Sequence, residues 1–377
     1  MTITNYNRCG TERVVFLSDI HMGVKNASIE WLDNICDYFN NFFIPLIEKY
    51  IKREKCILVI AGDFFDNRQS IDINVLNRGM DIIESLSSRL EVFLMIGNHD
   101  IYKKKDTDTT SLRAFTHIDN VHVLYNTTTV DIGPEYNTKK MLLIPWVGDP
   151  KEENKILSSF AGDNIDIAVL HSDICGLRYD NGREILNGVN ISSFSGTKIY
   201  SGHIHKRQST EKVTYFGSPY QMRRSDIGNV KGVYSLQCSQ EGELTEYFVE
   251  NLYSPQFLRL PLESILDMTT EQLKKIICNN YVDILIKQKY INEINVSKII
   301  EIADECNVKK IEIILDKSDS VLTEDDNTVK TNEMTIEEIF ISKINKMDSL
   351  TKEDIDTLEK LNQSYIGIAT GELNLNI

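Results

Sequence analysis

The sequence predicts an α/β fold in which a largely parallel sheet is covered on both faces. Over the first two-thirds of the chain, short apolar runs rich in β-branched residues alternate with longer stretches of helical periodicity. Polar residues with metal-binding side chains directly follow several of these apolar runs. Both observations are typical of an α/β sheet whose functional groups gather at the carboxyl ends of its strands.

Length and composition bound the class of protein. The 377 residues allow two or three domains, and 41% hydrophobic with 26% charged residues is an ordinary folded composition. No apolar run approaches the ~20 residues that span a bilayer, so we expect no membrane segment. The amino-terminal residues lack a signal or transit pattern, and the seven scattered cysteines form no Cys-x-x-Cys pair. We therefore expect a cytoplasmic protein with reduced thiols.

The net charge of −15 would argue against nucleic acid as a partner, because phosphate contacts are made by clustered Lys and Arg. Nearly half of that excess lies in residues 317–377, which carry 13 acidic and 6 basic side chains. Some of the other acidic side chains are candidates for binding divalent metal ions, which would offset their charge. The overall charge therefore does not exclude a nucleic-acid substrate.

Six strands and two helical stretches are predicted in the first part of the chain. The strands are Arg13–Ser18, Cys56–Ala61, Glu91–Ile96, Met141–Val147, Asp166–Leu170 and Lys198–Ser201. A crossover helix is predicted within Ser28–Ile51, and a second apolar-periodic stretch runs from Val75 to Leu86. Val213–Phe216 and Val233–Leu236 are predicted as further, antiparallel strands.

The pattern changes after residue 253. Predicted helices at Thr269–Cys278 and Ser297–Glu305 alternate with strands at Val282–Ile286 and Ile311–Leu315, which indicates a small α+β domain. Residues 317–333 are polar and acidic without periodicity, as in a linker. Two amphipathic helices are then predicted, with apolar stripes formed by Ile336, Phe340 and Ile344, and by Ile355, Leu358 and Leu361. We expect domains over 1–253 and 254–316, a linker over 317–333 and a helical segment over 334–377.

Residues able to bind metal follow the predicted strands one after another. They are Asp19-x-His21, Gly62-Asp63, Gly97-Asn98-His99-Asp100, His171 and Gly202-His203-x-His205. Each motif alone is weak, because a lone histidine more often completes a hydrogen bond in a core. Five of the seven histidines belong to the set, whereas His117 and His122 are expected to be surface or packing residues. Oxygen and imidazole donors without a thiolate suit manganese, iron or zinc, so we predict a dinuclear metal site.

This spaced set resembles the calcineurin-like metallophosphoesterase superfamily at every motif, over about residues 13–237. The resemblance implies a sandwich of β-sheets flanked by helices and a hydrolase with two divalent metal ions, for which we name Mn²⁺. The implied ligands of one ion are Asp19, His21, Asp63 and His205. Those of the other are Asp63, Asn98, His171 and His203, so Asp63 would bridge. His99 would face the scissile phosphate, stabilising charge or passing a proton to the leaving oxygen.

Within the superfamily, Gly62-Asp63-Phe64-Phe65-Asp66 and the segment Tyr-Phe-Gly-Ser-Pro-Tyr-Gln at 215–221 resemble the SbcD-type nucleases of double-strand-break repair complexes, which include phage recombination nucleases. Protein phosphatases of the superfamily carry Gly-Asp-x-Val-Asp-Arg-Gly and Gly-Asn-His-Glu instead, and both are absent here. The resemblance implies a nuclease for DNA repair and recombination, with 3′-to-5′ exonuclease activity on duplex ends and endonuclease activity on single strands. A phage-encoded chain would act in the host cytoplasm. For Asp66, a catalytic role and a surface salt bridge to Arg68 both stay open.

Charged residues near the predicted metal edge are candidates to bind DNA. They are Lys103, Lys104, Lys105, Arg207, Arg223 and Arg224. Tyr220 and Gln221 of the SbcD-like segment join this set, Tyr220 as a platform on which a base would stack. Three adjacent lysines in a loop are more often a solvated face, so the lysine run is the weakest member.

The SbcD-type pattern also implies roles for the remaining segments. Residues 254–316 would be a capping, DNA-binding domain, and the helices of 334–366 would dock on the coiled-coil base of an SMC-like ATPase of the SbcC type. Those helices could instead fold back on their own domain, and a homodimer also stays open. The chain contains no Gly-x-x-x-x-Gly-Lys loop, so we expect any ATP-driven step to belong to another subunit.

Two other functions use the same residues. A phosphodiesterase for cyclic nucleotides or another small phosphoester would need the same metal set, but not the cap, the segment at 217–221 or the C-terminal helices. A non-enzymatic scaffold with a structural metal site would not require His99. We take the nuclease as the principal hypothesis.

Overall fold

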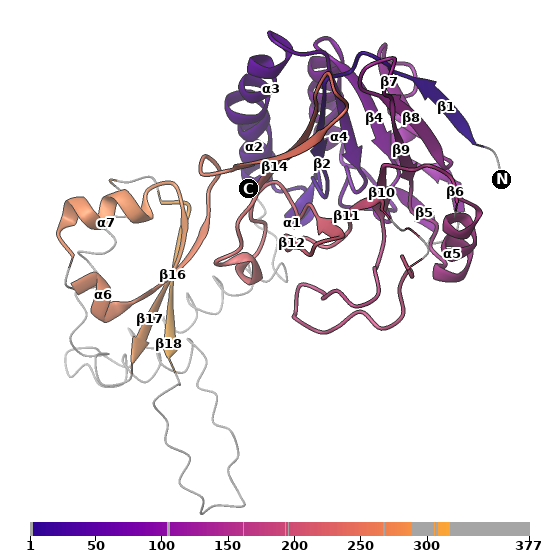
Figure 1. The fold of residues 1–377 in the computed structure, drawn as a ribbon. Coiled ribbons are helices and arrows are strands. Elements are labelled where there is room, and N and C mark those ends of the chain that lie inside the picture. Colours follow the sequence, from indigo (N-terminus) through magenta and orange to yellow (C-terminus); the bar gives the residue numbers. More distant parts are fainter. Residues whose placement is uncertain are drawn as a thin grey trace, which may run out of the picture. The chain divides into compact units, whose positions relative to one another are not determined.

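Two mixed β-sheets pack face to face in the larger part of the described chain, drawn on the right in Figure 1. The computed structural model describes residues 3–103, 106–160, 162–192, 194, 196–266, 268–287, 305 and 308–316. The strands of the seven-stranded sheet, in spatial order, are β1 (Thr4–Asn7), β8 (Thr128–Ile132), β9 (Lys139–Ile144), β10 (Ile167–His171), β11 (Lys198–Gly202), β13 (Val213–Tyr215) and β12 (Gln208–Ser209). Those of the six-stranded sheet are β15 (Leu244–Glu250), β14 (Gly232–Cys238), β2 (Arg13–Leu17), β3 (Cys56–Ala61), β4 (Glu91–Met95) and β7 (Val121–Leu124).

The six strands expected in the first part of the chain form with small shifts of their ends, but the expectation of one largely parallel sheet is wrong. The strands divide between two sheets: β2, β3 and β4 pair in parallel in one, and β9, β10 and β11 pair in parallel in the other. Every residue of β2 and β3 is buried. Alternate side chains pack against helices on one face of the sheet and against the second sheet on the other. A strand buried on both faces has the same composition whatever covers it, so its sequence does not show which layer lies there.

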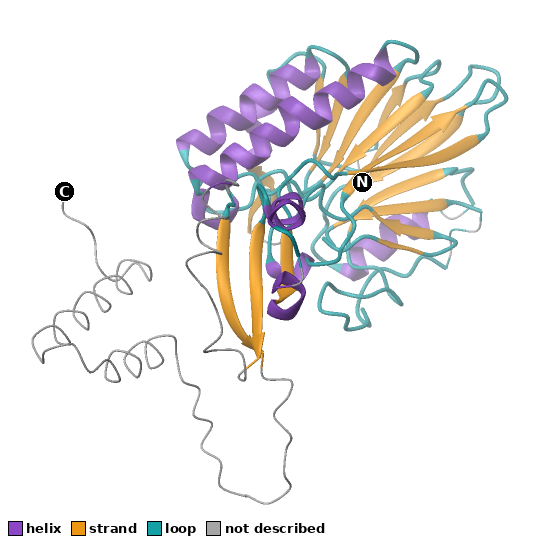
Figure 2. Cartoon of the chain, turned by 90° about the vertical axis from the view of Figure 1, so that its left-hand side faces the viewer, coloured by secondary structure: helices purple, strands orange, loops and turns teal. Residues whose placement is uncertain are grey.

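Helices cover the outer face of the six-stranded sheet, as Figure 2 shows. The crossover region folds as α2 (Ile29–Tyr38), a π-helical turn η1 (Phe39–Phe43) and α3 (Ile44–Ile51), preceded by the short turn α1 (Val24–Ala27). The second predicted stretch is α4 (Ile73–Ser87), whose first turn is capped by Asp72. On the other sheet, α5 (Pro150–Ser159) packs Leu157 against the outer face. The sandwich flanked by helices that the family resemblance implies is thus present.

Two expectations about later strands have different outcomes. Strand β14 pairs antiparallel with β2 and β15, as predicted. Strand β13 was expected to be antiparallel, but it continues the sheet in parallel with β11, and only the two-residue β12 is antiparallel to it. A small hairpin of β5 (Ile101–Lys103) and β6 (Asp106–Thr110) and the 3₁₀ turns η2 (Ser111–Phe115) and η3 (Arg224–Asp226) complete this part of the chain.

A smaller parallel sheet follows residue 253. It consists of β16 (Phe257–Pro261), β17 (Tyr281–Lys287) and β18 (Lys310–Asp316), with α6 (Leu262–Leu266) and α7 (Thr270–Ile277) packed on it. The predicted capping box opens α7: the Thr269 hydroxyl accepts from Gln272 N at 3.2 Å, and Gln272 Oε1 accepts from Thr269 N at 2.9 Å. The predicted helix 297–305, apart from Glu305, the linker 317–333 and the helical segment 334–377 lie outside the described residues. No helix among the described ranges is long and apolar enough to cross a membrane.

Candidate metal centre

The metal-binding residue types expected from sequence come together where the carboxyl ends of both central sheets meet. Strands β2, β3 and β4 of the six-stranded sheet lead directly into Asp19, Asp63 and Asn98. From the seven-stranded sheet, His171 ends β10, and His203 and His205 follow β11. All of these residues except His203 and His205 are at most 6% exposed, so their polar atoms are shielded from water.

The side chains form three overlapping groups whose nitrogen and oxygen atoms lie within 4.8 Å of one another. The groups are Asp19, His21 and His205; His21, Asp63 and His99; and Asp63, His171 and His203. In the first group, His21 Nε2 lies 3.0 Å from His205 Nε2, and His205 Nε2 lies 3.8 Å from Asp19 Oδ1. In the third, His171 Nε2 lies 3.3 Å from Asp63 Oδ2. Asn98 joins this group, because its Oδ1 lies 3.0 Å from His171 Nε2 and 2.7 Å from His203 Nδ1.

Asp63 is central to the arrangement. Its Oδ2 lies 3.8 Å from His21 Nε2 on one side and 3.3 Å from His171 Nε2 on the other. Its other oxygen, Oδ1, accepts from the backbone N–H of His99 at 2.7 Å. Burial disfavours the charged carboxylate, but the charge and hydrogen bond of His171, with the charge of His21, hold the pKa of Asp63 well below its usual range. Asp63 is therefore held as a carboxylate between His21 and His171.

Four residues of the centre have a strained backbone conformation. Asp19, His21, Asp63 and His203 have positive φ values of 54°, 51°, 54° and 83°, a conformation that costs free energy for residues other than glycine. At Gly97 the obstacle is space, because an added Cβ would lie 2.2 Å from both the backbone N and the Oδ1 of Asp63. The polar groups therefore come together at the cost of strained backbone conformations, and the close approach of Asp63 to residue 97 requires a glycine there.

The ring of His99 is oriented by a backbone carbonyl. Its Nδ1 lies 2.6 Å from the oxygen of Asp66, which can only accept a hydrogen bond, so Nδ1 carries a proton and Nε2 is left free. The Asp66 carboxylate points elsewhere, with Oδ1 3.0 Å from His21 Nδ1. Of the two roles left open for Asp66, the structure favours one at the site, because both its side chain and its carbonyl contact site histidines.

Several residues around the centre were given no role in the sequence analysis. Asp100 is 1% exposed, and its carboxylate accepts from the backbone N–H groups of Gly97, Phe64 and Phe65 at 2.9, 3.3 and 3.0 Å. Burial, followed by the charge of Asp63, raises the pKa of Asp100 to about 6. The sequence shows that Asp100 follows Asn98 and His99, but it does not show which backbone N–H groups bind the Asp100 carboxylate.

Asp173 and Lys231 were also missed. Asp173 Oδ1 lies 3.3 Å from His203 Nε2, on the side of the ring away from Asn98. A carboxylate at this position can hold the orientation of the imidazole ring. The Lys231 ammonium, 5% exposed as a residue, donates to His205 O at 2.6 Å, Ser218 Oγ at 2.8 Å and Asp226 Oδ1 at 3.2 Å. The contacts of Asp173 with His203 and of Lys231 with His205 join segments far apart in the sequence, and no local pattern reveals them.

The donor set fits divalent metal ions. Imidazole nitrogens converge on each other and on buried carboxylates, and burial raises the pKa of the fully buried Asp19, so a cation would stabilise its carboxylate. His171 donates from Nδ1 to Ala61 O at 2.7 Å, which leaves Nε2 available as a ligand. Ligation through His205 Nε2 would put that ring's proton on Nδ1, and the Arg223 Nη2 that now lies 3.3 Å from Nδ1 would then turn away.

Comparison with known proteins agrees with this chemistry. The family model of calcineurin-like phosphoesterases matches residues 12–207, which is more than half of the chain. The chain belongs to this family. It is a metal-dependent phosphoesterase, and its buried histidine and aspartate clusters are typical of a dinuclear metal site.

Two viral proteins are similar along much of their length. Exonuclease subunit 1 of Enterobacteria phage T4 is 24% identical over 368 residues, covering 94% of this chain and 98% of that protein. The candidate phosphoesterase 078R of Invertebrate iridescent virus 3 is 24% identical over 285 residues, covering 71% and 72% of the two chains. Among solved structures, a cold-active protein tyrosine phosphatase gives 14% identity and a TM-score of 0.28 over 66% of this chain and 80% of that chain, a similarity too low to support an argument.

The residues expected to contact DNA lie in different environments in this phosphoesterase. Tyr220 is a core residue: it is 4% exposed, its hydroxyl donates to Ile20 O at 2.6 Å, and its ring packs against Tyr38. This corrects the expectation that it stacks on a base. Gln221 is 7% exposed, and its Oε1 accepts from Phe257 N at 2.7 Å, so it joins β16 to the rest of the chain.

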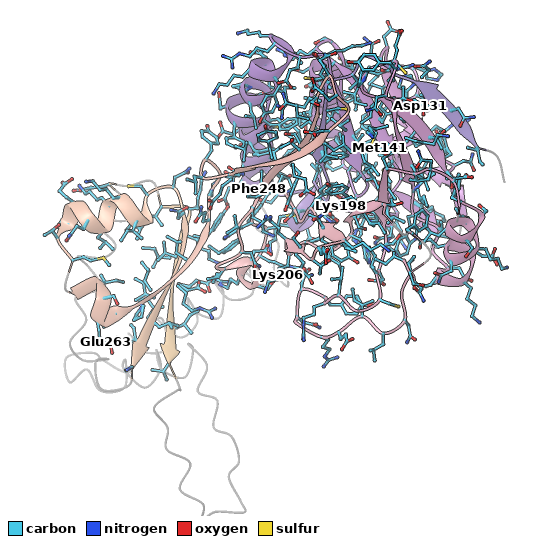
Figure 3. The ribbon with its side chains drawn as sticks, viewed as in Figure 1. Asp131, Met141, Lys198, Lys206, Phe248 and Glu263 are labelled. Atoms are coloured by element: carbon cyan, nitrogen blue, oxygen red, sulfur yellow. The ribbon has the colours of Figure 1, made fainter. Side chains whose placement is uncertain are left out.

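The basic residues also differ. Arg207 lies over the ring of Phe248, labelled in Figure 3, at 4.4 Å, and its Nε donates to the Tyr234 hydroxyl at 2.5 Å. Arg224 pairs with Asp283 at 2.9 Å and with Glu312, both on the smaller sheet. Arg223 is 42% exposed and pairs with Asp180, next to His205. Lys103 lies on β5 near Tyr102, while Lys104 and Lys105 lie outside the described residues.

Proposed function

We propose that this phosphoesterase is a DNA nuclease of a repair and recombination complex, with 3′-to-5′ exonuclease activity on duplex ends and endonuclease activity on single strands. The observation that carries the proposal is the similarity to exonuclease subunit 1, which extends over 94% of this chain and 98% of that protein and so includes the segments beyond the phosphoesterase match. A phosphoesterase for small molecules would need only the metal centre.

The proposed ligands form two sets that share one carboxylate. Asp19, His21 and His205 would hold one ion, and Asn98, His171 and His203 the other, with Asp63 between them. We propose Mn²⁺, which suits this mixture of oxygen and imidazole donors. Two bound divalent ions would supply a nucleophile from water at neutral pH and polarise the phosphate oxygens.

The residues of the chain itself would position the substrate and move a proton. His99 is held by the Asp66 carbonyl with Nε2 free, so a protonated Nε2 can donate to the phosphate or to the leaving oxygen. Asp173 would keep His203 in its ligating orientation. Arg223 is the proposed phosphate contact beside the centre, because its guanidinium is partly exposed and lies next to His205.

We also propose roles for the remaining segments. Residues 254–316 would cap the site, tied to the nuclease domain by Arg224 with Asp283 and by Trp31, whose ring stacks on that of Tyr281 at 5.3 Å. The predicted helices of 334–366 would bind an SMC-like ATPase of the SbcC type. The phage T4 relative is named as a subunit, which supports the proposal that this chain acts in a complex. The apolar stripes of the predicted helices support the proposal that these helices bind another protein.

One experiment separates the nuclease from a small-molecule phosphodiesterase. The purified chain is incubated with end-labelled duplex DNA, with single-stranded DNA and with a chromogenic phosphodiester, each in Mn²⁺, Mg²⁺ and EDTA. We expect DNA cleavage in Mn²⁺ that EDTA abolishes, with mononucleotides released from 3′ ends of the duplex. Hydrolysis of the small ester without any cleavage of DNA would reject the nuclease proposal.

A further inference from the structure

A shallow hollow adjoins the metal centre on the side of His99. Its volume is about 390 Å³, and its lining consists of Asp66, Asn67, Arg68, Gln69, His99 and Tyr102. Sites for small molecules span ~300–1,000 Å³, so this hollow is large enough for one nucleotide and too small for a duplex. Tyr102 is 49% exposed and was not among the residues expected to contact DNA.

Both walls of the hollow are anchored on Asp100. The loop that carries Arg68 follows Phe64 and Phe65, whose backbone N–H groups donate to the Asp100 carboxylate. Tyr102 lies on β5 two residues after Asp100, and the Asp100 carbonyl accepts from the Thr110 hydroxyl at 2.8 Å on the partner strand β6. Ile101 is fully buried, so the alternation of the strand turns Tyr102 outward. The phenol ring therefore lines the same hollow as His99.

The chemistry of the lining suits a nucleotide. An exposed aromatic ring provides a stacking surface for a base, and a guanidinium provides a bidentate contact for a phosphate. The acidic residue of the lining does not oppose this, because the Asp66 carboxylate lies 3.0 Å from His21 Nδ1 and its carbonyl is bonded to His99. Tyr220, the aromatic residue first expected to stack on a base, is buried and cannot do so in this fold.

We propose that Tyr102 and Arg68 form a nucleotide subsite next to the scissile phosphate, in which a base stacks on the Tyr102 ring and Arg68 contacts an adjacent phosphate. This proposal rests on the proposed nuclease function. It assigns the recognition of the strand to the loop after β3 and to Tyr102 of β5, on the His99 side of the centre.

The test uses the full chain in Mn²⁺ and a series of short single-stranded oligonucleotides in which one base at a time is removed around the cleavage site. With the wild type, removal of the stacked base is expected to raise KM about 10-fold. With Tyr102→Leu, the intact oligonucleotide should already show that higher KM, and removal of the same base should add nothing. Tyr102→Phe keeps the ring and should behave as the wild type.

Two further variants complete the design. Tyr136→Leu removes a tyrosine that is 76% exposed on the turn between β8 and β9 and should leave every KM unchanged. Arg68→Gln should reduce the slope of log KM against log salt concentration by about the amount that one phosphate contact contributes. Arg53→Gln, at an exposed position, should leave that slope unchanged.

The outcomes are distinct. Equal KM penalties for base removal in the wild type and in Tyr102→Leu would reject the subsite while leaving a DNA nuclease in place. A chain that cleaves no DNA would reject the proposed function, and the subsite with it.

Discussion

The Nδ1 atom of His99 lies 2.6 Å from the backbone carbonyl oxygen of Asp66. Because a carbonyl only accepts, this contact places a proton on Nδ1 and directs Nε2 away from the loop. His171 is oriented in the same way by the carbonyl of Ala61 at 2.7 Å, but its Nε2 faces Asp63 and Asn98. A backbone carbonyl thus orients both a histidine among the proposed ligands and the histidine that lines the hollow.

The first prediction is that His99→Ala lowers kcat by ~10²–10⁴-fold, as the loss of a proton donor does, while the metal content of the protein stays unchanged. Steady-state kinetics and elemental analysis of the same preparation test it. His117→Ala is the control, because His117 is an exposed histidine outside the centre. Loss of bound metal in His99→Ala would mean that this histidine is a ligand.

The second prediction concerns Asp63, whose Oδ2 lies between His21 and His171. Asp63→Ala should empty or strongly weaken both metal sites, since it removes the one carboxylate shared by the two ligand sets. Titration calorimetry with Mn²⁺ gives the stoichiometry, and the exposed Asp163→Ala serves as the control. Two ions bound with wild-type affinity in Asp63→Ala would disprove the bridging role.

The strands and the metal-binding motifs were predictable because both depend on local patterns. Val14 to Leu17 and Ile57 to Ala61 are apolar runs, and Asp19 and Asp63 follow them directly. The partition of the strands into two sheets was not predictable, since a buried strand face gives no sign of whether a helix or a sheet covers it. Tyr220 failed as a base platform for a similar reason. Its burial depends on Tyr38 of the distant helix α2, which the local Gly-Ser-Pro-Tyr-Gln segment does not reveal.

Groups that support the centre from behind were the hardest to find. Asp173 follows β10, and its carboxylate lies near His203, which follows β11. Glu153 lies on α5, and its carboxylate accepts a hydrogen bond from the Ser172 hydroxyl. Aspartate and glutamate are common on surfaces, so only the contacts of both residues and the burial of Glu153 distinguish them from ordinary charged residues.

A third prediction separates catalysis from partner binding. Truncation after Asp316 should leave Mn²⁺-dependent cleavage of short single-stranded DNA largely intact, because every proposed ligand lies before residue 206. Replacement of Ile336, Phe340 and Ile344 by Asp in the full chain should block binding of the ATPase partner, since each buried side chain contributes roughly 1.5–3 kcal/mol. Ser342→Asp with Asn345→Asp, on the opposite side of the predicted helix, is the control. Undiminished affinity of the truncated chain in calorimetry would move the docking surface to the 254–316 domain.

The last prediction concerns the stability of the fold as a function of pH. Glu153 is 3% exposed, and burial raises its pKa from 4.5 to about 7, although the hydrogen bond from Ser172 acts in the opposite direction. Because the folded-state pKa lies above that of the unfolded chain, the folded state binds the proton more tightly between these two values. The contribution of Glu153 to the free energy of unfolding therefore falls as the pH rises from about 4.5 to about 7, by an amount on the order of 3 kcal/mol.

Glu153→Gln keeps an acceptor for the Ser172 hydroxyl but removes the titration. The variant should match the wild type near pH 4.5 and become more stable than it above pH 7, as measured by urea denaturation in EDTA so that metal binding adds no pH dependence of its own. The neighbouring Glu152→Gln is the control, because Glu152 is on the exposed face of α5 and pairs with Lys155 at 2.6 Å. If the stability difference between Glu153→Gln and the wild type were the same at both ends of this pH range, the buried carboxyl would not be the group that titrates.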